Sequence, residues 1–352
     1  MNVAIRVDAS SEIGIGHVMR CLTLARLLQN NLKVNIVFVC NSDIPVSLID
    51  EIKEKNFELI LIKKQELGSF SQTVDSLMFY EVVKDLYLDW VIIDHYLLDF
   101  IWEQAIKPYT KHIFVIDDLA NRKHVCDILL DQNLYPNIYK RYEALVPNGC
   151  KLLLGPEFLL LREDFRTEPQ PPARIDCRHV LVNFGGSDPT NEIDKVLHCI
   201  EDTKNDFKLI HFHLIAGPAN PNQSELEKRC SYLTNVTFYR EYKSMAKLLT
   251  KIDLCIGAGG ISLWERCFMG VPSIVITVAD NQIESVREAE KHGLIWNLGD
   301  SSRVDSQMIS ELLKQIQLCP ILITEKSRRA MAFMQPLRNS NIHPIISMMR
   351  QF

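Results

Sequence analysis

The sequence has 352 residues, longer than one average domain, so we expect two domains of roughly 150 to 200 residues each. Lys and Arg number 39 and Asp and Glu 44, a net charge of −5, and no block of basic residues indicates a surface for nucleic acid or a membrane. No apolar run approaches about 18 residues, and Met1–Asp8 lacks the long apolar core of a signal peptide. We therefore expect a cytoplasmic protein with no membrane or nucleic-acid partner.

The 10 cysteines are scattered singly, and none of them forms a Cys-x-x-Cys pair. Most of them lie within apolar runs. This distribution favours buried free thiols in a reducing compartment over a disulfide framework or a zinc site.

Short β-branched runs alternate with amphipathic stretches of helix length from the first residues onward. A strand at 2–8 precedes a helix at 17–29, and further strands are predicted at 33–39, 57–63, 89–96, 112–118 and 126–132. These strands are apolar almost throughout, which is typical of a parallel sheet covered by helices on both faces.

This alternation stops at 168–176, where frequent prolines favour an extended connector and exclude a helix. Strands resume at 179–188, 212–218, 236–242, 253–260, 271–280 and 294–300. We therefore predict two doubly wound α/β domains, an N-terminal domain at 1–167 and a C-terminal domain at 177–325, joined by a linker at 168–176. A helical extension at 326–352 is broken by Pro336, and in such twin-domain architectures a terminal helix packs back on the first domain.

The first motif is the turn after the first strand, where Gly14 and Gly16 precede His17 at the start of a helix. Ligands of open α/β sheets collect at the carboxyl ends of strands, where the next helix directs free N–H groups at them. Met19 stands where a dinucleotide-binding fingerprint would have its third glycine, so dinucleotide binding is not favoured. A helix N-terminus favours a neutral imidazole, which is equipped to act as a general base. The alternative is a histidine that only bonds a loop carbonyl.

The second motif is a glycine-rich turn that includes Gly259 and Gly260 and separates an apolar strand from a short helix. Free loop amides and the helix dipole make such a turn a cradle for phosphate. Ser262 and Glu265 are three residues apart on this helix, so both can face the ligand. A carboxylate there can accept hydrogen bonds from both ribose hydroxyls. The alternative is a tight turn followed by a solvated glutamate.

Other polar residues also follow predicted strands. Asn281 and Gln282 open the helix after the next strand, and their amides suit a sugar or a phosphate, although alone they would indicate only a helix N-cap. Asp94-His95-Tyr96 and Asp117-Asp118 end strands of the first domain, where a sugar would lie. The aspartate pair has no third metal ligand at a suitable spacing, so we expect no metal site.

With these residues in view, the chain resembles the GT-B superfamily and, within it, the PseG family, the UDP-2,4-diacetamido-2,4,6-trideoxy-β-L-altropyranose hydrolases of pseudaminic acid synthesis. The resembling segments span most of the chain: RVDASSEIGIGHVMRCLTLA, VIIDHY, VIDDLA, LLGPEFLLLREDF, NFGGSD, GAGGISLWERCFMGVPSI and ADNQ. The G-x-G-H-x-x-R run is specific to this family, whereas the glycine-rich turn and its helix are shared with MurG-like transferases. The resemblance implies two Rossmann-like domains that face each other across a cleft.

The resemblance also implies roles for matched residues. It makes His17 the base that activates water, and it assigns the ribose and pyrophosphate of UDP to Glu265 and the loop around Gly260. Residues 239–245 are expected to contact uracil through their backbone, while 63–88 and 318–352 stay unassigned. The expected substrate- and nucleotide-binding residues are Gly14, Gly16, Arg20, Tyr96, Gly259, Gly260, Ser262, Glu265, Asn281 and Gln282.

The expected reaction is a single displacement at the anomeric carbon. Water adds from the face opposite UDP, His17 takes its proton, and the C1–O bond breaks with inversion. Loop amides and the helix N-terminus stabilise the leaving diphosphate, so we expect neither a cofactor nor a metal. The runner-up is an inverting glycosyltransferase that uses the same UDP-sugar donor. A third hypothesis, a sensor of nucleotide-sugars without catalysis, is disfavoured because binding alone needs no titratable group at His17.

Overall fold

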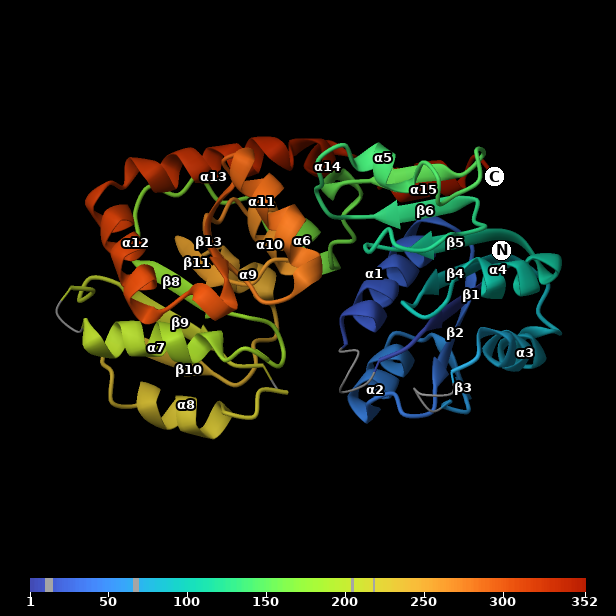
Figure 1. The fold of residues 1–352 in the computed structure, drawn as a ribbon, viewed down its shortest axis with the longest axis horizontal. Helices are drawn as coiled ribbons and strands as arrows, with labels where there is room; N and C mark the ends of the chain where they lie inside the picture. The colour runs from blue at the N-terminus through green and yellow to red at the C-terminus, as the bar shows by residue number, and fades with distance from the viewer. Residues whose placement is uncertain (10–14, 66–69, 204–205, 218) are drawn as a thin grey trace. The chain divides into compact units, whose positions relative to one another are not determined.

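A parallel β-sheet forms the centre of each of the two units into which the chain divides (Figure 1). The computed structural model describes residues 1–9, 15–65, 70–203, 206–217 and 219–352. The first unit comprises Met1–Gln132, Asn137–Leu160 and Ser340–Phe352, and the second comprises Asn133–Pro136 and Leu161–Asn339. The predicted α/β class, with two Rossmann-like, doubly wound sheets, is confirmed.

The first sheet has seven strands in the order β3-β2-β1-β4-β5-β6-β7, and every neighbouring pair is parallel. In the centre of the sheet, Ile5 of β1 lies opposite Phe38 of β2 and Ile92 of β4. The strands are β1 (Asn2–Val7), β2 (Asn35–Asn41), β3 (Glu58–Ile62), β4 (Leu88–Asp94), β5 (Thr110–Ile116), β6 (Ile128–Asp131) and β7 (Lys151–Leu154).

Helices on both faces explain why these strands are apolar throughout. Ile5 and Ile92 belong to one hydrophobic core, whereas Ala4 and Val91 belong to a second core. Successive side chains of a strand point to opposite faces, so a sheet buried on both faces needs apolar residues at every position. The first core contains residues of α1 (Gly16–Asn31), α2 (Val46–Glu54) and α15 (Pro344–Met349). The second contains residues of α3 (Gln72–Val83), α4 (Phe100–Ile106) and α5 (Ile138–Tyr142).

The end of the chain completes the first core. Ile345 and Ile346 of α15 are fully buried there. The ring of His343 accepts a hydrogen bond from the Ile345 backbone amide, and Arg350 donates to the carbonyl oxygen of Asn31, the last residue of α1. The helical extension expected at 326–352 is therefore divided between the units, because residues up to Asn339 belong to the second.

The second sheet has six parallel strands in the order β10-β9-β8-β11-β12-β13. One of its faces carries a core that includes residues of β8, β9, β11 and β12. The strands are β8 (His179–Asn183), β9 (His211–Ile215), β10 (Val236–Tyr239), β11 (Leu254–Gly257), β12 (Ser273–Thr277) and β13 (Ile295–Asp300).

Helices alternate with these strands (Figure 1). Pro336, expected to break the extension, occupies the second position of α14, where a missing N–H leaves no helical bond unmade. The helices are α6 (Glu163–Thr167), α7 (Glu192–Asp202), α8 (Gln223–Cys230), α9 (Met245–Leu249), α10 (Ile261–Phe268), α11 (Ile283–Lys291), α12 (Ser306–Leu318), α13 (Ile321–Phe333) and α14 (Gln335–Asn339).

The connector at 168–176 is extended, as its prolines require, and it is anchored within the second unit. The backbone amide of Arg174 donates to the Ser327 hydroxyl at 2.9 Å, and its guanidinium Nε donates to the carbonyl of Ile252 at 2.6 Å. Arg174 is buried, so these bonds replace the water that the side chain has lost.

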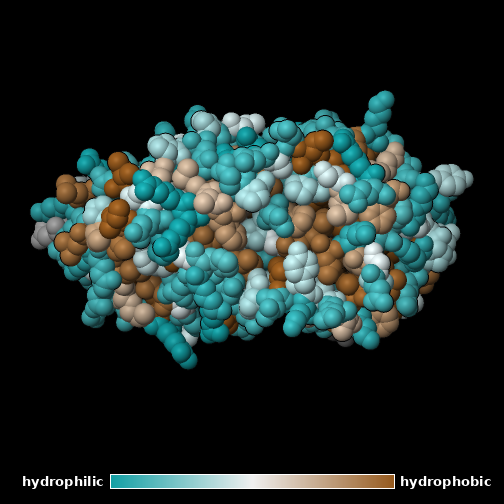
Figure 2. All heavy atoms as spheres, turned by 90° about the horizontal axis from the view of Figure 1, so that it is seen from above, coloured by the Kyte–Doolittle hydropathy of each residue, from teal (hydrophilic) through white to brown (hydrophobic). Residues whose placement is uncertain are grey.

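Hydrophilic side chains cover much of the face seen in Figure 2, with apolar residues between them. None of the helices in the described residues has the length and apolar character needed to span a membrane. Isolated apolar side chains on a surface are usual in folded proteins.

Candidate functional site

Each sheet reverses its strand order at one point, and the motifs found in the sequence stand at those points. The reversal lies between β1 and β4 in the first sheet and between β8 and β11 in the second. Ligands of open α/β sheets bind beyond the carboxyl ends of the strands at such a switch point. His17 follows β1 and Tyr96 follows β4, whereas the glycine loop, Gly257–Gly260, leads from β11 into α10.

A cluster of polar side chains, some of them buried, occupies the switch point of the first sheet. This cluster, the His17 cluster, comprises His17, Arg20, Asp94, Tyr96 and Asp118. His17 and Arg20 lie one turn apart in α1, and both contact the carboxylate of Asp94 at the end of β4. His17 Nδ1 is 2.5 Å from Asp94 Oδ1, while Arg20 Nε and Nη2 are 2.5 and 2.6 Å from Oδ2 and Oδ1.

These contacts determine which nitrogen of His17 carries a proton. Burial raises the pKa of Asp94, but the positive charge of Arg20 and the hydrogen bonds from Arg20 and His17 outweigh burial and hold the pKa well below its usual range. Arg20 Nη2, an obligate donor, also lies 3.0 Å from His17 Nδ1. The Asp94 carboxylate, which only accepts, is the nearer partner at 2.5 Å, so we assign the proton to Nδ1. In the neutral ring Nε2 then holds a free electron pair, so Nε2 is the nitrogen that can accept a proton.

Tyr96 and Asp118 border the same histidine. The Tyr96 ring meets the His17 ring edge to face, with centroids 4.5 Å apart, and Tyr96 is 36% exposed. Burial and the neighbouring carboxylate of Asp118 raise the pKa of Tyr96, so its hydroxyl stays protonated. Asp118 also lies 3.3 Å from Arg20 Nη1, which links both strand ends to the arginine that holds Asp94.

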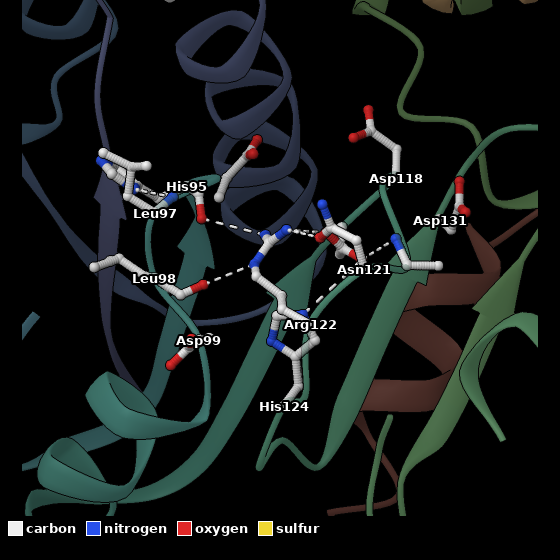
Figure 3. A network of polar contacts seen from close by, with 12 residues as sticks. His95, Leu97, Leu98, Asp99, Asp118, Asn121, Arg122, His124 and Asp131 are labelled. Carbon is white, nitrogen blue, oxygen red and sulfur yellow. Dashed lines mark hydrogen bonds and ion pairs between the residues drawn. The ribbon is translucent and has the colours of Figure 1, made fainter. Parts of the chain in front are cut away.

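Arg122 joins the loops that follow β4 and β5 (Figure 3). Its Nε donates to the carbonyl of Leu98 at 3.0 Å and its Nη2 to the carbonyl of His95 at 3.3 Å. Its Nη1 lies 2.9 Å from Asp117 Oδ1, and the guanidinium stands 6.0 Å from the centre of the Tyr96 ring. Arg122 therefore fixes the loop that presents Tyr96, and sequence analysis did not single it out.

His95, considered in the sequence as an end-of-strand candidate, has no free ring nitrogen. Its Nε2 lies 3.0 Å from Asp8 Oδ2, and its Nδ1 accepts a hydrogen bond from the backbone amide of Leu97. Burial raises the pKa of Asp8, but Arg6 and His95 outweigh it and hold the pKa below its usual range. His95 thus orders the loop after β4 and is not placed to take a proton from water.

The two aspartates that end β5 are paired with positive side chains. Asp117 contacts Arg122 and accepts from the hydroxyl of Tyr142 at 3.2 Å, while Asp118 contacts Arg20. In the part of the chain that the structure describes, no group of three His, Cys, Asp or Glu side chains is arranged to hold a metal ion. The arginines, which sequence spacing could not place there, neutralise these carboxylates.

The glycine loop requires glycine for two different reasons. Gly260 has φ +76°, in the left-handed region that side chains rarely adopt. A Cβ on Gly259 would lie 2.7 Å from Val286 Cγ2 and 3.2 Å from Gln282 Oε1, so α11 and the turn before it pack directly on the loop. The sequence interpreted this turn as a phosphate cradle, with a tight strand-to-helix turn as the alternative; at Gly259 the protein's own side chains already exclude a Cβ.

Glu265 stands one turn into α10, with its side chain 13% exposed. Its Oε1 lies 3.4 Å from Nε of Arg162, a residue that the sequence did not single out. Burial raises the pKa of Glu265, and the charge of Arg162 opposes this shift. Ser262 accepts a hydrogen bond from Arg266 at 3.2 Å, so its hydroxyl proton is free to be donated elsewhere.

Asn281 and Gln282 lie in a 3₁₀ turn, Asp280–Gln282, after β12, and α11 begins only at Ile283. Gln282 packs on the glycine loop and accepts a hydrogen bond from the backbone of Val278 at 3.3 Å. Asn281 is exposed, and its carbonyl oxygen is 3.5 Å from the hydroxyl of Tyr135. The carboxyl ends of β11 and β12 thus bring Gln282 beside Gly259 and Gly260.

The remaining predicted site residues differ in exposure and in their contacts. Gly14 lies outside the described residues. Gly16 is the exposed first residue of α1, and nothing in the described part of the chain lies within 4 Å of a Cβ added there. Arg20, expected among the residues that contact substrate, is buried and directs its guanidinium at Asp94 and Asp118. The segment 239–245 runs from the last residue of β10 to the first residue of α9, and the rings of Tyr239 and Tyr242 pack edge to face with centroids 5.2 Å apart.

Known proteins share sequence and fold with this chain. Residues 179–335 match the glycosyltransferase family 28 C-terminal domain. An uncharacterised protein of Methanocaldococcus jannaschii is 28% identical over 78% of this chain, but the match spans only 55% of that protein. The spore coat polysaccharide biosynthesis protein SpsG of Bacillus subtilis is 26% identical, covering 92% of this chain and 91% of SpsG. The UDP-2,4-diacetamido-2,4,6-trideoxy-β-L-altropyranose hydrolase of Campylobacter jejuni is 29% identical, covering 83% of this chain and 97% of the hydrolase.

The predicted resemblance to the PseG family is confirmed. Solved structures extend the likeness at the level of the fold. MurG of Acinetobacter baumannii superposes with a TM-score of 0.69 at 14% identity, over 100% of this chain and 99% of MurG. The UDP-GlcNAc 2-epimerase of Neisseria meningitidis superposes with a TM-score of 0.65 at 12% identity, with full coverage of both chains. The chain therefore has the GT-B fold.

Proposed function

We propose that this chain hydrolyses UDP-2,4-diacetamido-2,4,6-trideoxy-β-L-altropyranose at the anomeric C–O bond, with inversion, and releases UDP and the free sugar. The observation that carries the proposal is the His17–Asp94 pair at the switch point of the first sheet. Its Nδ1 proton is directed at a buried carboxylate, which leaves Nε2 as a base. The similarity to the Campylobacter jejuni hydrolase supports the choice of substrate.

The chemistry follows from the His17 cluster. A water oxygen attacks the anomeric carbon, and its proton passes to Nε2 of His17 as the new C–O bond forms. The electron pair of the breaking bond leaves with UDP, so one displacement inverts the anomeric centre. Asp94 stabilises the imidazolium that forms, and Arg20 keeps Asp94 ionised and in place. A base without a covalent nucleophile is the minimum set for such a step.

The second unit supplies the groups for the nucleotide. The amides of the glycine loop precede α10, a helix of eight residues, and a helix N-terminus favours a diphosphate. Glu265, partly open to solvent, would accept the ribose hydroxyls, and Ser262 and Gln282 offer neutral donors beside the loop. The same amides would stabilise the leaving UDP, so the proposed reaction uses no metal.

The runner-up is an inverting glycosyltransferase that uses a UDP-sugar donor. The match of residues 179–335 to a glycosyltransferase family 28 domain favours it, because an acceptor hydroxyl can replace water at the same base. The two functions differ in one observable property. A hydrolase releases UDP without any acceptor, whereas a transferase requires one.

The deciding experiment incubates the purified protein with the UDP-sugar in heavy-oxygen water and no acceptor. We expect release of UDP, inversion at the anomeric carbon by NMR, and the oxygen label on the sugar and not on UDP. Label in UDP would show attack at phosphorus and reject the mechanism. UDP release only after an acceptor is added would establish the transferase. Stronger thermal stabilisation by UDP than by CDP or GDP is expected, and equal shifts would contradict the choice of nucleotide.

In a cell, this reaction would run in the cytoplasm. It would supply the free sugar for pseudaminic acid biosynthesis and, through it, for glycosylation of flagellin or capsule. The product of the hydrolysis is a reducing sugar with a free anomeric hydroxyl, so the class of enzyme that consumes it must act on an unactivated sugar.

A further inference from the structure

Two of the ten free cysteines lie side by side in the first unit, away from the His17 cluster. Cys126 Sγ and Cys150 Sγ are 3.6 Å apart, although 24 residues separate them in the sequence. Among the described residues, no other pair of cysteine sulfur atoms is in hydrogen-bond contact. We propose that Cys126 and Cys150 are a modification site, a dithiol that a peroxide oxidises to an intrachain disulfide.

The backbone holds these thiols together. Cys126 precedes β6 and Cys150 precedes β7, and neighbouring strands of a sheet lie about 4.8 Å apart. The amide of Lys151 donates to the carbonyl of Asp127 at 2.8 Å, and the amide of His124 donates to the carbonyl of Leu145 at 2.7 Å. These bonds fix both chain segments on either side of the sulfur atoms. A disulfide needs Cα atoms about 4.4 to 6.8 Å apart, and the spacing of neighbouring strands is compatible with that separation.

The two thiols differ in solvent exposure, and this difference indicates which of them a peroxide oxidises first. Cys126 is 4% exposed, whereas Cys150 is partly exposed at the end of the largely exposed segment 143–149. Hydrogen bonding to the sulfur of Cys150, together with burial, raises the pKa of the Cys126 thiol. Cys126 is therefore the less reactive thiol of the two. Cys150 is the more accessible of the two thiols, so we expect a peroxide to oxidise it first.

The oxidation is balanced with hydrogen peroxide as the oxidant. The Cys150 thiolate attacks one peroxide oxygen, the O–O bond breaks, and a sulfenic acid and hydroxide form; the hydroxide takes up the proton that the thiol lost and becomes water. Cys126 then attacks the sulfur of the sulfenic acid, the S–S bond forms, and a second water leaves with the Cys126 proton. Two thiols and one peroxide give one disulfide and two waters.

Peptide mapping of the full-length protein tests the proposal. Cleavage after lysine and arginine gives peptides 124–140 and 142–151, each of which contains one cysteine of the pair and no other. After brief peroxide treatment, alkylation and digestion, we expect these two peptides to be linked and to separate with dithiothreitol. Because the disulfide closes a loop of 24 residues, we also expect a higher Tm that reductant reverses.

Substitutions assign the order of the two steps. Cys126→Ser should leave Cys150 as a sulfenic acid that dimedone traps, whereas Cys150→Ser should leave Cys126 reduced. Cys319 is exposed and is the matched control, so Cys319→Ser should form the linked peptides as the wild type does. If Cys319 is oxidised while Cys126 and Cys150 are both still alkylated, or if the disulfide joins other cysteines, the proposal is wrong. Mapping of the wild type decides this even if a variant fails to fold.

Discussion

Polar side chains dominate the switch point of the first sheet, whereas backbone groups dominate that of the second. In the first unit, the buried side chains of His17, Arg20 and Asp94 lie within hydrogen-bond distance of one another. In the second unit, the corresponding position is mostly backbone, the glycine loop, with Glu265 one turn into the helix beyond it. The first arrangement fixes the position of a proton, whereas the second presents N–H groups to an anion.

The pKa values of acidic side chains also differ between the two units, because they are shifted in opposite directions. Neighbouring charges outweigh burial and lower the pKa of Asp8 and Asp94 in the first unit. In the second unit, burial dominates and raises the pKa of Asp188 and Glu265. The simplest interpretation is therefore that the first switch point carries the catalytic groups and the second binds the nucleotide. It predicts that substitutions in the first unit change kcat and that substitutions in the second change KM.

The largest expected effect is that of His17→Asn. Asn keeps hydrogen-bonding capacity at this position but cannot accept a proton at neutral pH, so kcat should fall by about 10² to 10⁴. UDP affinity, measured by calorimetry, should not change. Near-normal turnover in the variant would place the base elsewhere.

Asp94→Asn should lower kcat by a smaller factor. An amide no longer fixes the Nδ1 proton or stabilises the imidazolium, and loss of one charged hydrogen bond corresponds to about 1.5 to 3 kcal/mol, or about 10- to 100-fold in rate. Asp118→Asn is the matched control, because Asp118 contacts Arg20 as Asp94 does. Equal losses in both variants would show that Asp94 acts only by holding Arg20.

Glu265→Ala should raise KM and weaken UDP binding, with kcat little changed. A carboxylate that accepts two ribose hydroxyls contributes about 1.5 to 3 kcal/mol, which corresponds to roughly tenfold to a hundredfold in affinity. Arg162→Gln is a useful comparison because Arg162 contacts the same carboxylate. Unchanged UDP affinity in Glu265→Ala would mean that Glu265 serves only its ion pair with Arg162.

Acidification should destabilise the first unit more than the second. The folded-state pKa values of Asp8 and Asp94 are depressed, so their contribution is complete above the unfolded value of about 4 and is lost as the pH falls below it. The raised pKa values of Asp188 and Glu265 act in the opposite direction, because these groups favour the protonated form when folded. Hydrogen exchange between pH 5 and about pH 3, corrected for intrinsic rates, should show earlier loss of protection in β1 and β4. Earlier loss in β8 and β11 would contradict this assignment.

The smallest expected effect is that of chelation. EDTA should leave turnover unchanged, because the amides of the glycine loop and the N-terminus of α10 can neutralise the diphosphate. The assay compares initial rates before and after dialysis against EDTA. A loss of activity that magnesium or manganese restores would direct attention to Asp117 and Asp118.

The sequence by itself determined the fold class and the identity of the strand-end motifs. Apolar strands that alternate with amphipathic helices predict a parallel sheet, because a sheet covered on both faces needs apolar residues at successive positions. The glycines of the second motif indicated a strand-to-helix turn. The reason is local, because φ at Gly260 is +76° and this conformation strongly favours glycine. Local conformational rules of this kind act within a few residues and can be read directly.

Only the tertiary structure decided which of these residues act together. His17 and Asp94 are 77 residues apart, and they meet because β1 and β4 pair at the switch point of the sheet. Arg122 and Arg162 carried no local signal, since their partners come from other loops and helices. The thiols of Cys126 and Cys150 likewise meet only because β6 and β7 are neighbours. Strand order depends on long-range packing, which no short stretch of sequence encodes.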